Sequence, residues 1–136
     1  DNRKERAMRY GLEALYKGIE VVRAGAPISA IGDAIERFCS SRGYTVIQEY
    51  GGHHIGRKMH EDPLIPHKYY KENDEKFLEE GKIICIEPMI TPGKGNTAVA
   101  KDGWTAYCRD GQPVVMWEHM ILVTADSYEI LTKHID

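Results

Sequence analysis

Residues 52–63 of this chain read Gly52-His53-His54-Ile55-Gly56-Arg57-Lys58-Met59-His60-Glu61-Asp62-Pro63. His53 and His60 are seven residues apart, and an extended segment can bring them to one side without forcing both into one coordination shell. Gly52 and Gly56 flank the first histidines, and because glycine has no Cβ, a ligand can approach the backbone closely there. The segment therefore indicates a metal site, with a second histidine left free for catalysis.

Two glutamates lie in apolar surroundings further along the chain. Glu87 follows the apolar run 83–86, and Glu118 lies within the largely apolar segment 114–124. A buried carboxylate is costly unless a cation or hydrogen bonds meet it. Imidazole combined with carboxylates, without thiolates, suits Mn, Fe(II), Co or Zn. These residues, together with His53, are therefore candidate metal ligands.

Two amphipathic helices are predicted at the start of the chain. The first has an apolar face at spacings of four and three residues. Its members are Met8, Leu12, Leu15, Ile19 and Val22. Gly25 and Pro27 end this helix. Ser29 is the expected N-cap of the second helix, and Gly43 is its C-terminal stop. The short connection predicts that the two helices lie nearly antiparallel.

Strand patterns dominate the rest of the chain. They cover 44–47, 82–86, 97–100, 104–109, 114–124 and 128–132. The pair Asp102-Gly103 predicts a tight hairpin, and the aperiodic segment 67–76 predicts a surface loop. We expect His67 and His134 to be exposed, and His119 to face away from Glu118 by strand alternation. Two helices packed on an antiparallel sheet make an α+β fold.

The bulk composition is that of a soluble globular chain. Its 136 residues suffice for one domain with a core, so we treat residues 1–136 as a single domain. The net charge of −3 gives no general attraction to nucleic acid or to anionic membranes. No apolar run is long enough to span a bilayer, and no signal-peptide pattern opens the sequence, so we expect a cytoplasmic protein. Cys39, Cys85 and Cys108 show no C-x-x-C spacing, which predicts reduced, buried cysteines.

The motifs together closely resemble the methionine aminopeptidases of type I, from about Arg6 to Thr132. The resemblance is carried by Gly52-His53-x-Ile55-Gly56-x-x-x-His60-Glu61-x-Pro63, Ile86-Glu87-Pro88-Met89, Lys101-Asp102-Gly103-Trp104 and Glu118-His119. The second and third motifs separate the chain from prolidases, which share the fold and a similar histidine motif. The resemblance implies the C-terminal half of a pita-bread (creatinase/aminopeptidase) fold, in which two α+β halves are related by a pseudo-twofold axis.

That family holds two divalent metal ions with two aspartates, one histidine and two glutamates. The resemblance implies that His53 and Glu87 bind one metal and that Glu118 bridges both. His60 matches a catalytic histidine that is not a ligand and contacts the scissile amide of the substrate. The implied metals are Co, Mn, Fe or Zn.

The resemblance also identifies a substrate and a pocket for it. Met59 and Trp104 match residues at the pocket for the methionine side chain. The implied function is metal-dependent removal of N-terminal methionine from nascent peptides, a metallo-aminopeptidase activity.

Two departures from the family pattern carry expectations. His54 stands where the family has a small residue, so it would either strain the backbone or intrude on the site. The family's N-terminal half, with both aspartate ligands, has no counterpart here. We therefore expect a depleted site with weak metal affinity, and a partner that is either the missing N-terminal half or a second copy in a homodimer through an exposed face. Neither nucleic acid nor membrane is expected as a partner.

The alternative is a non-catalytic pita-bread module that binds peptides or proteins, or an inactive fragment. Such a module could lose its ligands freely, whereas His53, His60, Glu87 and Glu118 all match the enzyme pattern. That match favours a chain derived from the enzyme.

Overall fold

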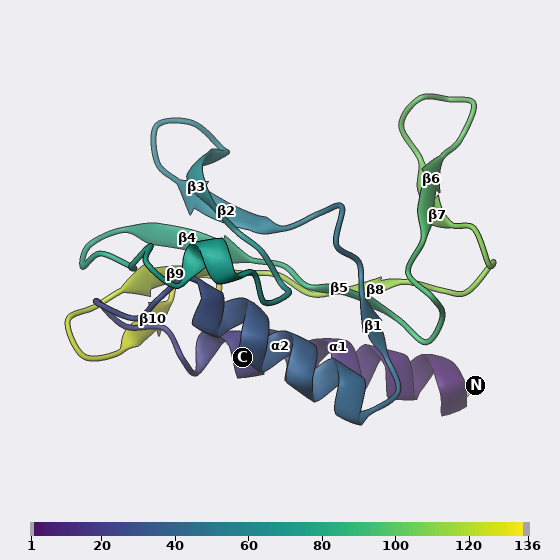
Figure 1. The fold of residues 1–136 in the computed structure, drawn as a ribbon, viewed down its shortest axis with the longest axis horizontal. Coiled ribbons are helices and arrows are strands. Elements are labelled where there is room, and N and C mark those ends of the chain that lie inside the picture. The colour runs from purple at the N-terminus through teal and green to yellow at the C-terminus, as the bar shows by residue number, and fades with distance from the viewer. Residues whose placement is uncertain (1, 135–136) are drawn as a thin grey trace.

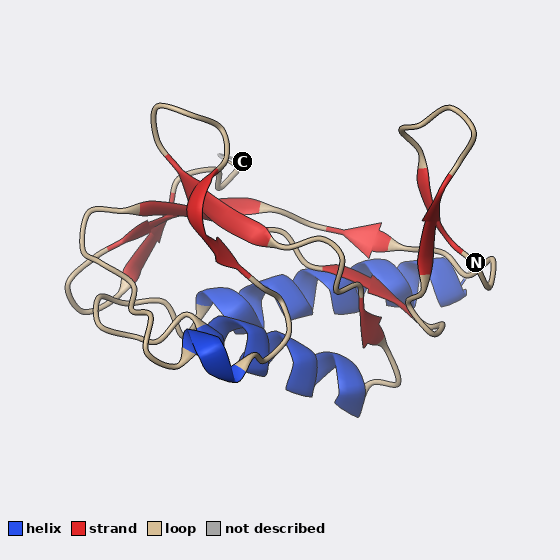
Figure 2. Cartoon of the chain, turned by 45° about the horizontal axis from the view of Figure 1, so that its top comes forward, coloured by secondary structure: helices blue, strands red, loops and turns tan. Residues whose placement is uncertain are grey.

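The computed structural model describes residues 2–134, in which two helices pack against one side of antiparallel strands (Figure 1). Helices α1 (Asn2–Ile19) and α2 (Ser29–Ser41) lie side by side as one layer, and the strands form the other (Figure 2). The predicted α+β class, with helices on an antiparallel sheet, is confirmed. None of the helices in the described part of the chain is both long and apolar enough to cross a membrane.

The largest sheet has five strands in the order β10-β9-β4-β2-β3, and every neighbouring pair is antiparallel. Its strands are β2 (Gly52–Ile55), β3 (Glu61–Ile65), β4 (Ile83–Ile86), β9 (His119–Val123) and β10 (Tyr128–Ile130). A three-stranded sheet of order β1-β5-β8 continues the strand layer. Its strands are β1 (Thr45–Val46), β5 (Met89–Thr91) and β8 (Val115–Met116).

A two-stranded hairpin projects from the strand layer on the side away from the helices (Figure 1). Its strands are β6 (Thr97–Val99) and β7 (Ala106–Cys108). Gly103 in its turn has φ 72°, a left-handed conformation that glycine adopts without steric cost. The hairpin predicted around Asp102-Gly103 is therefore confirmed.

The hydrophobic core fills the space between the helices and the sheets. Its largest fully buried side chains include Leu15, Ile19, Ile31, Ile35, Ile84, Ile86, Ile90 and Ile121. The predicted buried face of α1 is wrong at Met8, which is half exposed, whereas Ala7, Gly11 and Ala14 are buried. A Cβ on Gly11 would lie only 3.0 Å from a methyl of Val115. Small residues therefore let α1 approach β8 closely.

Other local predictions are corrected by the structure. Ile28, not Ser29, is the N-cap of α2, and it has helical φ and no side-chain cap. The segment predicted as a loop contains the short 3-10 helix η1 (Lys71–Asn73). The strand predicted over 114–124 is interrupted between β8 and β9 at Trp117 and Glu118. All three cysteines are free and buried, as predicted.

The residues that interrupt the strand between β8 and β9 contact helix α1. The indole N–H of Trp117 donates to the carbonyl oxygen of Met8 at 3.0 Å. Trp117 also packs beside the position where Gly11 has no side chain. These contacts hold the interruption against α1, and they place Glu118 outside regular sheet pairing.

Candidate metal centre

The strand register brings the predicted ligands together. His53 on β2 lies opposite Cys85 on β4. The β4–β9 register pairs Ile86 with His119, so Glu87 and Glu118 follow as the next opposed positions. Cross-strand neighbours in an antiparallel pair have Cβ atoms about 5 Å apart. Three adjacent strands therefore deliver one imidazole and two carboxylates to a single place.

Strand alternation explains why these side chains share one face. Ile84 and Ile86 belong to the core beneath the helices, whereas Cys85 does not. Because successive residues point to opposite faces, Cys85 and Glu87 project away from the core. The same alternation separates His53 from His54. The apolar strand β4 thus supplies core residues and site residues in turn.

The ring of His53 is held in an orientation that would suit a metal ligand. Its side chain is nearly buried, at 5% exposure, and its Nδ1 lies 2.9 Å from the carbonyl oxygen of His54. A carbonyl only accepts hydrogen bonds, so Nδ1 donates and a neutral ring keeps its lone pair on Nε2. That Nε2 lies 3.4 Å from a carboxylate oxygen of Glu87. A hydrogen bond like the one from Nδ1 to the carbonyl oxygen of His54 commonly fixes the tautomer of metal-ligating histidines.

The carboxylates show an electrostatic conflict that a cation would resolve. Burial, and next the charge of Glu118, raise the pKa of Glu87 well above its ordinary value, while His53 opposes this. No lysine or arginine within residues 2–134 forms an ion pair with either glutamate. Two close carboxylates and an imidazole lone pair match the donors of a divalent transition-metal site. The residues present therefore fit such an ion.

The other predicted site residues are only partly gathered here. A pocket of about 340 Å³ is lined by His53, Ile55, Met59, His60, Cys85, Glu87, Glu118 and Met120. The ring of His60 lies 4.4 Å from that of His53, between centroids. Trp104 is outside this pocket, 90% exposed in the turn of the β6–β7 hairpin. Its assignment to a substrate pocket stays a prediction.

The prediction that His67 is exposed is wrong. His67 is 3% exposed, and its Nε2 accepts a hydrogen bond from the backbone N–H of Glu87 at 3.1 Å. Burial, and next the charge of His53, lower the pKa of His67 to about 3. A neutral His67 thus positions the backbone of a candidate ligand. Its polar, aperiodic sequence context gave no signal of this, whereas Cys85, two residues before Glu87, could have been found by strand alternation.

His54 neither strains the loop nor enters the site. No described residue other than glycine has a positive φ, and the Nδ1 of His54 donates to the carbonyl oxygen of Pro63 at 2.7 Å. His54 lines a separate pocket beside Lys82. A Cβ on Gly52 would collide with the carbonyl oxygen of Cys85, so glycine there lets β2 approach β4. The predicted close approach of a ligand at Gly52 stays a prediction.

The remaining polar residues near these motifs have other partners. His119 packs edge-on against Tyr16 of α1, and its Nδ1 lies 2.7 Å from the hydroxyl of Thr132. His119 therefore faces the helix side while Glu118 faces the pocket, as strand alternation predicted. Among residues 2–134, no aspartate joins the close donor cluster.

The chain is similar over most of its length to known proteins. Methionine aminopeptidase of Escherichia coli strain K12 is 39% identical over 132 residues, which cover 97% of this chain and 50% of that protein. The crystal structure of methionine aminopeptidase from Thermotoga maritima matches with a TM-score of 0.93 at 36% identity, over 98% of this chain and 53% of that one. This chain therefore spans about half the length of these relatives.

A structure with lower sequence identity shares the same fold. Prolidase from Pyrococcus furiosus, 23% identical, has a TM-score of 0.74 over 100% of this chain and 34% of its own. At that identity it shows the shared fold alone, which is the pita-bread fold predicted for this chain. The model of metallopeptidase family M24 matches residues 1–125, nearly the whole chain and every candidate ligand. This chain accordingly belongs to metallopeptidase family M24.

Proposed function

We propose that this chain supplies one half of the active site of a methionine aminopeptidase, which removes N-terminal methionine from nascent peptides. The observation that carries the proposal is the convergence of His53, Glu87 and Glu118 from adjacent strands. A buried imidazole with its Nε2 directed at Glu87, beside a second carboxylate, is a donor set for a divalent ion. The likeness to methionine aminopeptidases over almost all of the chain supports the choice of substrate.

Each residue of the pocket has a role in this proposal. His53 and Glu87 would hold one divalent ion, drawn from Co, Mn, Fe or Zn, and Glu118 would contribute to holding both ions. When bound, such ions polarise the scissile carbonyl and activate water. His60, exposed beside His53, contacts the scissile amide and stabilises the charge that develops there. Met59 at the pocket edge contacts the methionine side chain.

The proposal requires a partner for the face that carries the site. Two aspartate ligands come from the other half of the fold, since none joins the cluster within residues 2–134. Trp104, on the projecting hairpin, meets the substrate pocket only in the complete enzyme. The partner is an N-terminal half or, as the second possibility, another copy of this chain. Nascent peptides as substrate place the complete enzyme in the cytoplasm.

The decisive experiment completes the site. The chain is fused to the N-terminal half of the Escherichia coli relative and assayed with the peptides Met-Ala-Ser and Leu-Ala-Ser in the presence of Mn²⁺ or Co²⁺. We expect turnover of the Met peptide alone, and loss of about 100-fold or more on His53→Ala or Glu118→Gln. Arg37→Ala, an exposed position on α2, is the control and leaves turnover unchanged.

The opposite results are equally informative. Turnover by the fusion that survives Glu118→Gln would contradict the assigned ligand. Robust turnover by the chain alone would overturn the expectation of a depleted site. Peptide binding without turnover would favour a non-catalytic binding module. Sedimentation of the chain at high concentration addresses the partner, because a stable monomer would exclude the homodimer.

A further inference from the structure

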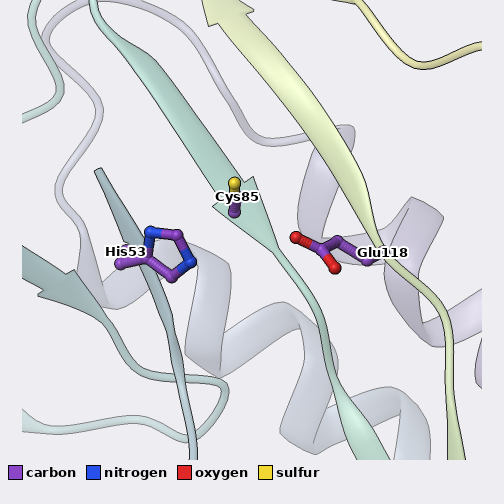
Figure 3. Close-up of side chains that lie close together, drawn as sticks. All are labelled: His53, Cys85 and Glu118. Carbon is purple, nitrogen blue, oxygen red and sulfur yellow. The ribbon is translucent and has the colours of Figure 1, made fainter. Parts of the chain in front are cut away.

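A thiol lies among the candidate metal-binding side chains. Ligand atoms of His53, Cys85 and Glu118 all lie within 4.8 Å of one another. Figure 3 shows the three side chains together, with Cys85 on its strand between the imidazole and the carboxylate. This cluster shares two members with the set of His53, Glu87 and Glu118. Cys85 replaces Glu87 as the third donor.

The dimensions of the cluster suit a single cation. For three atoms no more than 4.8 Å apart, some point lies within about 2.8 Å of all of them. Zinc binds sulfur at about 2.3 Å and nitrogen or carboxylate oxygen at about 2.0–2.2 Å. Shifts of about half an ångström in the ligand atoms, by side-chain rotation, would therefore bring all three within bonding distance of one zinc ion. His53 needs no change of tautomer, because its Nδ1 is already bonded to the carbonyl of His54.

The position of Cys85 differs from that of Cys39, a buried cysteine that packs in the hydrophobic core. Free cysteines commonly act as small apolar side chains in a core. Cys39 does so, as a member of the hydrophobic core cluster, whereas Cys85 is outside that cluster. Cys85 instead lines the pocket that contains His60 and both glutamates.

We propose that Cys85 is a metal donor that makes this site prefer thiophilic divalent cations, such as Zn²⁺ and Cd²⁺, over Mn²⁺. Thiolate attracts these softer ions, whereas the carboxylate set suits Mn²⁺ as well. Coordination forms a metal–sulfur bond, and the thiol proton leaves to solvent. The inference deepens the proposed function, because it shares His53 and Glu118 with it. It needs no donor outside this chain.

Spectroscopy of the metal-loaded chain tests the inference without any peptidase assay. Co²⁺ is added to the purified chain, and the near-ultraviolet band for charge transfer from thiolate to cobalt is recorded. Binding of Zn²⁺, Cd²⁺ and Mn²⁺ is measured by calorimetry. The variants are Cys85→Ser and Cys85→Ala, with Cys108→Ser as the matched control, since Cys108 is also buried but lies on β7. Circular dichroism verifies that each variant is folded.

We expect the band in the wild type and in Cys108→Ser, and its loss in both Cys85 variants. Affinity for Zn²⁺ and Cd²⁺ should fall about tenfold or more in the Cys85 variants, with Mn²⁺ affinity changed less than about twofold. Binding of Co²⁺ without the band, or an unchanged ratio of Zn²⁺ to Mn²⁺ affinity, overturns the role of Cys85. Those results leave the carboxylate set and the peptidase proposal intact. If the wild-type chain binds none of these ions, the inference is overturned, while the fusion assay still decides the proposed function.

Discussion

The two faces of the five-stranded sheet are made by the same strands but carry different kinds of side chain. The face toward the helices carries fully buried aliphatic side chains such as Ile84 and Ile121. The opposite face carries His53, Cys85 and Glu87, whose neighbours are polar or open to the pocket. Neighbouring residues on one strand therefore belong in turn to the hydrophobic core and to the candidate metal site.

This difference teaches where stability and function can be altered independently. Apolar burial stabilises by an amount that scales with area, so the helix-facing side dominates the free energy of unfolding. Close carboxylates and buried imidazoles cost stability unless a cation or hydrogen bond compensates. Substitutions on the two faces should therefore separate loss of folding from loss of metal binding.

The largest expected effect lies on the helix-facing side. Ile84→Ala should lower the free energy of unfolding by about 2–5 kcal/mol, because it leaves a cavity in the core. Urea unfolding measures the change. The matched control is Ile83→Ala, the preceding residue on the same strand, which is only partly buried. Equal losses at both positions would contradict the contrast between the faces.

A substitution where β2 approaches β4 most closely should affect both folding and metal binding. Gly52→Ala introduces a Cβ that collides with the carbonyl oxygen of Cys85. Backbone cannot yield as a side-chain end can, so we expect a loss of about 2–3 kcal/mol together with weaker Co²⁺ binding. Gly51→Ala is the control, since its Cβ would be 3.4 Å from its nearest neighbour. A fully stable Gly52→Ala would show that β2 and β4 can separate freely.

A third substitution tests the role of the buried histidine His67. His67→Leu removes the acceptor of the Glu87 backbone N–H, and the unsatisfied donor should cost about 1–2 kcal/mol. His67→Gln keeps an acceptor oxygen and should recover part of that loss. Unfolding curves and Co²⁺ titrations are read on both variants. Identical stability and affinity in the two would argue against a positioning hydrogen bond.

The smallest effect concerns a thiol on the core side. Burial, and next the charge of Glu36, raise the pKa of Cys39 to about 12. In the unfolded chain the thiol ionises near 9, so the stability that a protonated Cys39 confers is present below that pH and declines as pH rises toward 12. The stability difference between wild type and Cys39→Ala should fall by on the order of 1 kcal/mol between pH 8 and pH 10. A difference independent of pH would contradict the burial of an un-ionised thiol.

Much of the fold could be predicted from periodicity alone. The two helices, the hairpin at Asp102-Gly103 and most strands follow from the spacing of apolar residues and from turn chemistry. The interruption at Trp117 and Glu118 could not be predicted. It depends on an indole hydrogen bond to Met8, a contact between segments that no local pattern relates.

The site shows the same limit. His53 could be proposed from its glycine-flanked segment, and Glu87 and Glu118 because carboxylates in apolar strands are costly to bury. Cys85 lies two residues before Glu87, so strand alternation could place it on the same face. His67 lies in a polar segment that gives no such signal, and its role depends on burial and on a hydrogen bond that belong to the tertiary structure.

The bond between Trp117 and Met8 joins residues 109 positions apart, and it has a consequence for the order of folding. During synthesis α1 leaves the ribosome before β8, the strand that Gly11 lets it approach. The part of α1 that packs on β8 therefore stays uncovered until residues 115–116 have been made, an interval in which incompletely folded chains are prone to aggregate. Contacts so distant in sequence also slow folding, because the loop must close before the contact can stabilise it.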